Sequence, residues 1–336
     1  MPALNQPSLL LTQGDPAGIG PELALRAWML REERTLPPFA VLSDPAFLER
    51  VAQSQGWDVP IMVVETAQIP DTFPQALPVL PLSVPVSAQP GQPDAGAAAS
   101  VIESIEMAVR LVQKGAASAL VTNPIAKHVL YQAGFRHPGH TEFLAALASQ
   151  GRDETYHPVM MLWSEELAVV PVTVHISLAD VPSALTTDLI VKTGRIVARE
   201  LRERFGIANP RLALAGLNPH AGENGAMGME DVSIIVPAVD ILRAEGIEAA
   251  GPLPADTMFH ARARSRYDAA LAMYHDQALI PIKTIAFDEA VNVTLGLPFV
   301  RTSPDHGTAF DIAGKGIARP DSLIAAIKLA ARLGAS

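Results

Sequence analysis

Three of the nine histidines follow apolar runs that have the length of a buried β-strand. Each run ends where polar side chains begin, so each histidine is expected at the carboxyl end of a strand. Open α/β sheets bind their ligands beyond these ends, and three imidazoles placed there predict one shared site. The runs and their histidines are 167–174 with His175, 211–217 with His220, and 269–273 with His275.

Three imidazoles are a common ligand set for a catalytic divalent metal, and they leave positions open for substrate oxygen or nitrogen. Such a metal acts as a Lewis acid that lowers the pKa of a bound alcohol and orients it. The chain has no cysteine, so any metal must be held by imidazole and oxygen ligands. Asp276, and Asp256 in a proline-framed loop, are candidates for further ligands or for side chains that orient them. Each of these residues taken singly could also have a purely structural role.

A second group of polar residues is spaced nine positions apart in the last quarter of the chain. Lys283 and Arg301 bracket Asn292, and two cations around an amide donor could hold a phosphate or a carboxylate. The same side chains could also be ordinary surface residues. The polar segment 122–127 follows another apolar run and ends in Lys127, so it could also contribute to the site. Alternatively, its first residues could cap a helix that begins at Pro124.

The segment 13–22 is a glycine-rich turn between the apolar run 8–12 and a helix expected over 23–33. Its glycine spacing matches neither the G-x-G-x-x-G dinucleotide motif nor the Walker A loop. The glycines could therefore serve only to make a tight turn from strand to helix.

Composition restricts the class of protein. A chain of 336 residues with 49% hydrophobic residues is long for one core, so two lobes are expected. A net charge of -10 without a basic stripe argues against a nucleic-acid partner. The first residues lack the pattern of a signal peptide, and no apolar stretch approaches the roughly 20 residues that span a bilayer. We expect a soluble, cytoplasmic protein without a membrane partner.

Apolar runs of strand length alternate with segments of helical periodicity along the chain. This alternation predicts an α/β fold with a largely parallel sheet. The segment 69–93 is dense in proline and is expected to be a surface connection or an edge hairpin without a helix. Strands are expected at 8–12, 40–43, 61–64, 117–121, 159–162, 167–174, 211–215 and 269–273, and helices at 23–33, 96–115, 143–149, 185–205, 230–244 and 320–333.

Six polar or glycine-rich blocks stand in the order known from one enzyme family. The chain resembles the 4-hydroxythreonine-4-phosphate dehydrogenases of pyridoxal 5'-phosphate biosynthesis from residue 14 to residue 316, and six such blocks in this order are very specific. The blocks are GDPAGIGPE (14–22), GHTE (139–142), GLNPHAGE (216–223), GPLPADT (251–257), YHDQ (274–277) and NVTLGLP (292–298).

The resemblance implies a two-domain α/β fold like that of isocitrate and isopropylmalate dehydrogenases, with mostly parallel sheets flanked by helices and an interdomain active-site cleft. The nucleotide-binding lobe is expected over 1–138 plus 280–336, and the lobe for metal, substrate and dimerisation over 139–279. The segment 305–316 is similar to the nucleotide-binding loop of isopropylmalate dehydrogenases, which bind NAD without G-x-G-x-x-G. NAD or NADP is therefore expected to bind His306, Gly307, Thr308, Asp311 and Gly314.

The resemblance also assigns roles to the residues of the site. The three strand-end histidines match ligands of a divalent metal such as zinc, magnesium or cobalt. One of them is expected from the partner subunit of a homodimer, so the site would be shared across the interface. The general base stays open among Asp256, Asp276 and Lys127. The matching substrate-binding residues are His140, Thr141, Lys283, Asn292 and Arg301.

The implied reaction is the NAD(P)- and metal-dependent oxidation of 4-phosphooxy-L-threonine to 2-amino-3-oxo-4-(phosphooxy)butanoate, which decarboxylates to 3-amino-2-oxopropyl phosphate. Paralogous dehydrogenases for a four-carbon sugar-acid phosphate or a dihydrodiol dicarboxylate would keep the three histidines. Phosphate acyltransferases share the general fold and could use the segment 122–127. They need neither the histidines nor a reducing cofactor, so the histidines and the loop 305–316 argue against them.

Overall fold

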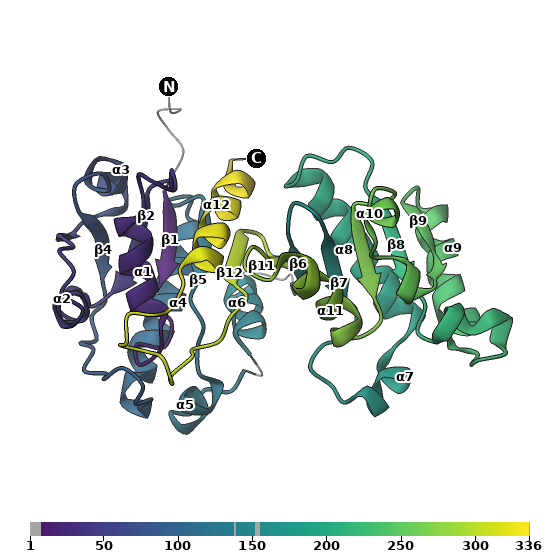
Figure 1. Ribbon diagram of the computed structural model, residues 1–336, viewed down its shortest axis with the longest axis horizontal. Coiled ribbons are helices and arrows are strands. Elements are labelled where there is room, and N and C mark those ends of the chain that lie inside the picture. Colours follow the sequence, from purple (N-terminus) through teal and green to yellow (C-terminus); the bar gives the residue numbers. More distant parts are fainter. Residues whose placement is uncertain (1–7, 138, 152–154, 336) are drawn as a thin grey trace. The chain divides into compact units, whose positions relative to one another are not determined.

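The computed structural model describes residues 8–137, 139–151 and 155–335. The chain forms two compact units (Figure 1). Unit 1 combines Met1–Pro158 with Leu297–Ala335, and unit 2 is Val159–Gly296. Residues 1–7, on which the expectation about a signal peptide rests, fall outside the described ranges. None of the described helices is long and apolar enough to cross a membrane.

Unit 1 is built on six parallel strands in the order β3-β4-β2-β1-β5-β12. The strands β1, β2, β5 and β12 are buried at every residue. This explains why the sequences of β1, β2 and β5 are largely apolar rather than alternating, whereas β12 buries the polar residues Arg301, Thr302 and Ser303. The bounds are β1 Leu9–Thr12, β2 Phe39–Ser43, β3 Ile61–Val63, β4 Leu77–Pro81, β5 Ala119–Thr122 and β12 Val300–Pro304.

Helices cover this sheet and bury its side chains. The α4 residues Val101 and Ile105 share one core with Leu10, Leu42 and Leu120, which come from three different strands. Helix α6 packs on α4 over the same core, while α1 and α12 pack on each other. The helices are α1 Gly20–Met29, α2 Pro45–Ser54, α3 Ile69–Thr72, α4 Ala98–Gln113, α5 Lys127–Gln132, α6 His140–Ser149 and α12 Asp321–Gly334.

Unit 2 has a mixed sheet in the order β11-β6-β7-β10-β8-β9. β6 runs antiparallel to both of its neighbours, as expected for the hairpin that joins it to β7. The strands β7, β10, β8 and β9 are parallel, so their carboxyl ends lie on one edge. The bounds are β6 Val159–Trp163, β7 Ala168–Pro171, β8 Arg211–Ala215, β9 Glu248–Leu253, β10 Ala269–Ala272 and β11 Val291–Leu295.

The core of unit 2 joins these strands to helix α11. Leu279 and Ile282 of this helix pack with Val169, Ala213 and Ala272 of the sheet. Helix α8 has the stronger apolar stripe and packs on α9. The helices are α7 Val181–Ala184, α8 Thr187–Glu203, α9 Val236–Ala244, α10 Ala261–Arg264 and α11 His275–Ala286.

Two local expectations were wrong. The proline-dense segment 69–93 contains helix α3 and the strand β4, which lies inside the sheet between β3 and β2. Leu77, Val79 and Leu80 are buried there, and their burial outweighs the absence of a backbone N–H at the two prolines of the strand. The helix after β5 begins at Lys127 instead of Pro124, so the polar segment before it is not that helix's cap.

The boundaries of the two units differ from those expected at 138/139 and 279/280. Helix α6 belongs to unit 1, because Phe143, Leu144 and Leu147 are part of its core. A break after Leu279 would divide α11, although Leu279 and Ile282 pack in the same core of unit 2.

Candidate active site

His175 and His275 emerge from neighbouring parallel strands of unit 2. β7 and β10 still pair just beyond their ends, where the N–H and the hydroxyl of Thr173 donate to the carbonyl oxygen of Met273 at 3.3 and 2.7 Å. Each histidine follows two residues after this contact, so both side chains leave the sheet at one level. Their ring centroids are 5.5 Å apart.

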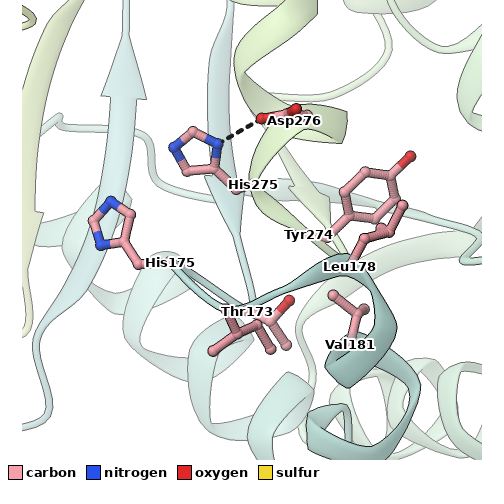
Figure 2. A pocket seen from close by; sticks show the side chains of 8 residues that line it. Thr173, His175, Leu178, Val181, Tyr274, His275 and Asp276 are labelled. Carbon is pink, nitrogen blue, oxygen red and sulfur yellow. Dashed lines mark hydrogen bonds and ion pairs between the residues drawn. The ribbon is translucent and has the colours of Figure 1, made fainter.

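His275 is held by the residue that follows it. Its Nδ1–H donates to Oδ1 of Asp276 at 2.7 Å, which leaves Nε2 to bind a metal. Figure 2 shows this second nitrogen on the side of the ring that faces His175. The Asp276 side chain is 70% exposed. Its position is that of a carboxylate that orients a metal-binding histidine.

Both histidines line a pocket of about 230 Å³ in unit 2 (Figure 2). Its walls are largely apolar, and the two imidazoles and the Asp276 carboxylate are among its polar groups. An apolar pocket with a few converging polar groups is typical of a small-molecule site. The other lining residues are Thr173, Ile176, Leu178, Val181 and Tyr274.

His220 lies in a left-handed turn of the backbone. The five residues 220–224 all have positive φ, between 43° and 76°, and only Gly222 is a glycine. A left-handed residue other than glycine costs roughly 1–2 kcal/mol, so this turn stores strain. His175 also has a positive φ of 54°. Strain of this kind concentrates at functional sites, where the surrounding structure holds it in place.

Buried polar groups support the turn. Asp231, which is fully buried, accepts N–H bonds from Leu217 at 2.9 Å and from Asn218 at 3.1 Å. It also accepts from the amide Nδ2 of Asn218 at 3.0 Å. Gln277 bridges the two strand ends, because its amide donates to the Gly216 carbonyl and accepts from the Met273 N–H. The loop that carries His220 is thus tied to the strand that leads to His275.

The described residues bring together two of the three predicted metal ligands. His175 and His275, with Asp276 behind one of them, fit a divalent ion as an imidazole pair. No group of three or more histidine, aspartate or glutamate side chains that could hold a metal occurs in the described part of the chain. His220 therefore does not complete the set within this one chain.

Arg301 is the main charged group of the candidate site in unit 1. Its guanidinium donates from Nε and Nη2 to Thr122 Oγ1 at 2.9 and 2.7 Å, across the neighbouring strands β12 and β5. The residue is only 4% exposed, and burial lowers its pKa to about 10. A shift of this size corresponds to a cost of about 3 kcal/mol for holding the charge at neutral pH. A bound anion would offset that cost.

His140 lies close enough to Arg301 to be influenced by its charge. Burial, and then the positive charge of Arg301, hold the pKa of His140 well below its usual value, so this imidazole is neutral. Its shielded Nε2 has no hydrogen-bond partner among the described residues, and the same is true of Asn123 Oδ1. Unsatisfied buried polar atoms of this kind are what a polar ligand would complete.

The other predicted residues lie around these two centres. In unit 1, Thr141 follows His140 at the start of α6, and the Lys127 ammonium lies 3.2 Å from the position that a Cβ atom on Gly139 would take. In unit 2, Lys283 on α11 stacks over the Phe287 ring at 5.5 Å. Asn292 of β11 pairs with Leu162, and Asp256 is exposed in the 3-10 turn Ala255–Thr257.

The predicted cofactor residues form an irregular loop after β12 in unit 1. His306 bonds through Nδ1 to the Gly307 carbonyl at 2.9 Å, and Asp311 is exposed. Gly314 has a φ of 75°, which favours glycine, and also approaches Pro90 too closely for a side chain. Together with Ala313 and parts of α2 it lines a pocket of about 530 Å³.

Sequence reasoning missed two residues that shape these centres. Thr122 was read as a possible helix cap, whereas it accepts both bonds from Arg301. The contact depends on the pairing of β5, which ends in Thr122, with β12, which contains Arg301, and the order of residues along the chain does not give this pairing. Asp231 was overlooked because it lies in a segment that was expected to be a helix. An acid shortly after the Asn218-Pro219-His220 loop could have indicated a side chain that accepts the backbone N–H groups of that loop.

The fold and these groups define a two-unit α/β protein that offers an imidazole pair for a divalent metal and a buried guanidinium for an anion. A sequence model of the family described as "Pyridoxal phosphate biosynthetic protein PdxA" matches residues 35–330. The chain belongs to this family, which confirms the resemblance seen in the sequence. Its mostly parallel α/β fold is confirmed as well.

Relatives agree over nearly the whole chain. A 4-hydroxythreonine-4-phosphate dehydrogenase from Methylorubrum extorquens is 63% identical over 327 residues, which cover 97% of this chain and 94% of the relative. A crystal structure of an enzyme of the same name from Klebsiella pneumoniae is 38% identical, with a TM-score of 0.88 and full coverage of both chains. A terephthalate 1,2-cis-dihydrodiol dehydrogenase from Burkholderia xenovorans is 29% identical, with a TM-score of 0.65 and 98% coverage of each chain. All three are dehydrogenases, so the family is one of oxidoreductases.

Replacing Arg301 with methionine should separate anion binding from folding. The variant removes a buried cation and keeps the side-chain volume, so its thermal midpoint should equal or exceed that of the wild type. Inorganic phosphate should raise the midpoint of the wild type but leave the variant unchanged, as measured by calorimetry. Arg195→Met removes an exposed arginine and should keep the response to phosphate. An equal response in Arg301→Met would refute the anion site.

Replacing Asp231 with asparagine should loosen the left-handed turn. The substitution leaves backbone N–H groups of Leu217 and Asn218 poorly paired, which costs about 1–3 kcal/mol. Hydrogen exchange at these two amides should accelerate about tenfold or more. The exposed Asp240→Asn is the matched control. Unchanged exchange in Asp231→Asn would show that other contacts hold the turn.

Proposed function

We propose that this chain catalyses the NAD(P)- and divalent-metal-dependent oxidation of 4-phosphooxy-L-threonine. The product, 2-amino-3-oxo-4-(phosphooxy)butanoate, loses its carboxylate as CO2 to give 3-amino-2-oxopropyl phosphate. Relatives that align with nearly the whole chain carry the name of the enzyme for this reaction. The observation in the structure that carries the proposal is the 5.5 Å pair of His175 and His275 at the ends of neighbouring parallel strands.

The imidazole pair is where a divalent ion would be held. A bound ion would supply Lewis acidity towards the substrate's C3 hydroxyl, and a dinucleotide would supply the hydride acceptor. Asp276 bonds to Nδ1 of His275 and orients its ring, so that Nε2 is available for that role.

Arg301 is the proposed anchor of the substrate's phosphate. Its guanidinium is already oriented by Thr122, so little side-chain freedom is lost when an anion binds. The neutral His140 beside it can donate or accept a hydrogen bond without adding charge. Thr141, Lys283 and Asn292 are proposed to complete the contacts to the substrate.

The proton acceptor for the C3 hydroxyl is proposed to come from Asp256 or Lys127. Asp276 is committed to His275 at 2.7 Å, which makes it a positioning residue rather than a base. Asp256 is exposed in unit 2, and Lys127 is exposed at the start of α5 in unit 1. Both side chains can therefore move towards a bound substrate.

A homodimer with shared metal ligands accounts for the missing third histidine. Seven of the exposed large apolar side chains of unit 2 follow one of the three histidines within twelve positions. Exposed apolar side chains gathered around a polar site mark a protein contact surface. We propose that His220 reaches the histidine pair of the partner subunit. The seven are Ile176, Leu178, Met227, Met229, Val232, Ile280 and Phe287.

The main alternative substrate is a dihydrodiol dicarboxylate, after the name of the Burkholderia neighbour. A buried arginine binds a carboxylate as well as a phosphate, so the same groups would serve. The two functions are separated by turnover. With NAD or NADP, 4-hydroxythreonine 4-phosphate should give growth of reduced-cofactor absorbance that a chelator abolishes. Faster turnover of erythronate 4-phosphate or of a dihydrodiol dicarboxylate would overturn the proposed substrate.

Mixing two inactive variants tests the shared metal site. His220→Ala and His275→Ala should each lose metal-dependent turnover. After subunit exchange, one site of each mixed dimer combines an intact His175–His275 pair with an intact His220. The equimolar mixture should then recover about a quarter of the wild-type activity, because half of the dimers are mixed and half of their sites are intact.

The control is a mixture of His175→Ala with His275→Ala. Both changes fall in the same pair, so no mixed dimer has a complete site and no activity should return. If the first mixture also stays inactive while exchange is verified by mass spectrometry, the three ligands do not divide between subunits in this way. Metal binding by each variant, measured by calorimetry, gives a readout that does not depend on turnover.

A further inference from the structure

One face of helix α1 is devoted to the loop that follows β12. The N–H of Ile19 donates to the Thr308 carbonyl at 3.0 Å, just before the helix begins. One turn later, Oε2 of Glu22 accepts the N–H of Gly314 at 2.9 Å. Arg26 then donates from Nη1 to the carbonyl of Ala318. Positions 19, 22 and 26 are three and four residues apart, so they lie on one side of the helix.

Gly18 lets the two segments approach. A Cβ atom at this position would lie 2.7 Å from the Thr308 carbonyl oxygen and 3.1 Å from its Cβ. The backbone of Gly18 is not in the left-handed region, so a side chain is excluded by space alone. The glycine is required because the loop passes directly against it.

Glu22 is a buried acid whose carboxyl group contacts the backbone of the loop. The residue is 2% exposed, and burial raises the pKa of its carboxyl while the Gly314 N–H and the Arg26 charge lower it. Its second oxygen, Oε1, is buried and has no hydrogen-bond partner among the described residues. An acid in the first turn is also favoured by the helix dipole. Burial of an ionised carboxylate is costly unless hydrogen bonds compensate it, and the N–H of Gly314 supplies such a bond.

We propose that the Gly14–Glu22 segment acts as a clamp for the dinucleotide loop, with Glu22 as its positioning residue. The clamp fixes the loop at Thr308 and at Gly314, and the exposed Asp311 lies between these two points. The inference rests on the proposed function, in which residues 306–314 bind NAD or NADP. It gives the glycine-rich motif a role other than a phosphate cradle: the motif binds protein, and the loop it holds binds the dinucleotide.

Two substitutions act on the clamp through different atoms. Glu22→Gln keeps the shape of the side chain but loses its charge, which weakens the bond from Gly314. Gly18→Ala places a methyl group against the Thr308 carbonyl, so the loop must shift. Each variant should bind NAD and NADP about tenfold more weakly than the wild type in the absence of substrate, as measured by calorimetry. The KM for 4-hydroxythreonine 4-phosphate at saturating dinucleotide should stay within about twofold.

Matched controls lie away from the loop. Glu200→Gln neutralises a similarly buried carboxylate of unit 2, and Gly96→Ala adds a methyl group that meets only the side chain of Asp94. Both should keep dinucleotide affinity at the wild-type level. Thermal midpoints of all four variants report whether the fold is intact.

The outcomes separate the clamp from the function on which it rests. A wild-type protein that binds neither NAD nor NADP would refute the proposed function. A wild type that binds, with Gly18→Ala and Glu22→Gln binding equally well, would refute the clamp alone. The clamp is also refuted if substrate KM and dinucleotide affinity change together, since that indicates a general distortion. If Glu22→Gln fails to fold, Gly18→Ala decides by the same measurement.

Discussion

Parallel strands that are buried on both faces leave only their ends for polar chemistry. Helices cover the sheet in each unit, and nearly every strand residue near the centre is shielded from solvent. The polar groups of the candidate site in unit 2 therefore follow the carboxyl ends of strands, which places His175 and His275 side by side. Unit 1 departs from this rule, because Arg301 lies inside β12 and reaches Thr122 at the end of β5. The two units thus present chemically different groups, an imidazole pair and a buried guanidinium.

Both centres hold groups in states that cost stability. The charge of Arg301 is buried at a cost that lowers its pKa to about 10, and the backbone at His220 is left-handed over five residues. Surrounding groups, notably Thr122 and Asp231, fix these costly arrangements before a ligand arrives. Preorganisation of this kind spends folding free energy so that less is lost on binding. The stability of the empty protein and its readiness to bind are thus opposed.

The sequence predicted the class of fold and the ends of most strands, because short continuous apolar runs between turn signals are typical of buried strands. The sequence did not predict two elements that contain proline. β4 was hidden by Pro78 and Pro81, and α11 was not expected after His275, since Pro281 lies inside that helix. The tertiary packing of Leu77 and Val79 against the sheet overrides the propensity of their neighbours.

The candidate site was predictable in its residue types but not in its groupings. That His175 and His275 pair, while His220 stays apart from them, depends on the register of β7 with β10, which order along the chain does not give. Thr122 and Asp231 were missed for the same reason, because each acts on a residue that is distant in sequence or hidden in a loop. Residues that are close in sequence can be recognised as a candidate site from the sequence, whereas residues that meet across a sheet can be recognised only once the strand pairing is known.

The three contacts of helix α1 bear on protein engineering. Ile19, Glu22 and Arg26 hold carbonyl and N–H groups of the loop backbone, so the helix tolerates changes in the loop's side chains but not in its path. If the loop were replaced by one of different length from another dehydrogenase, these backbone contacts with α1 would be lost. Redesign of this loop, the proposed dinucleotide site, therefore calls for side-chain changes on the existing loop, or for exchanging helix α1 and the loop together.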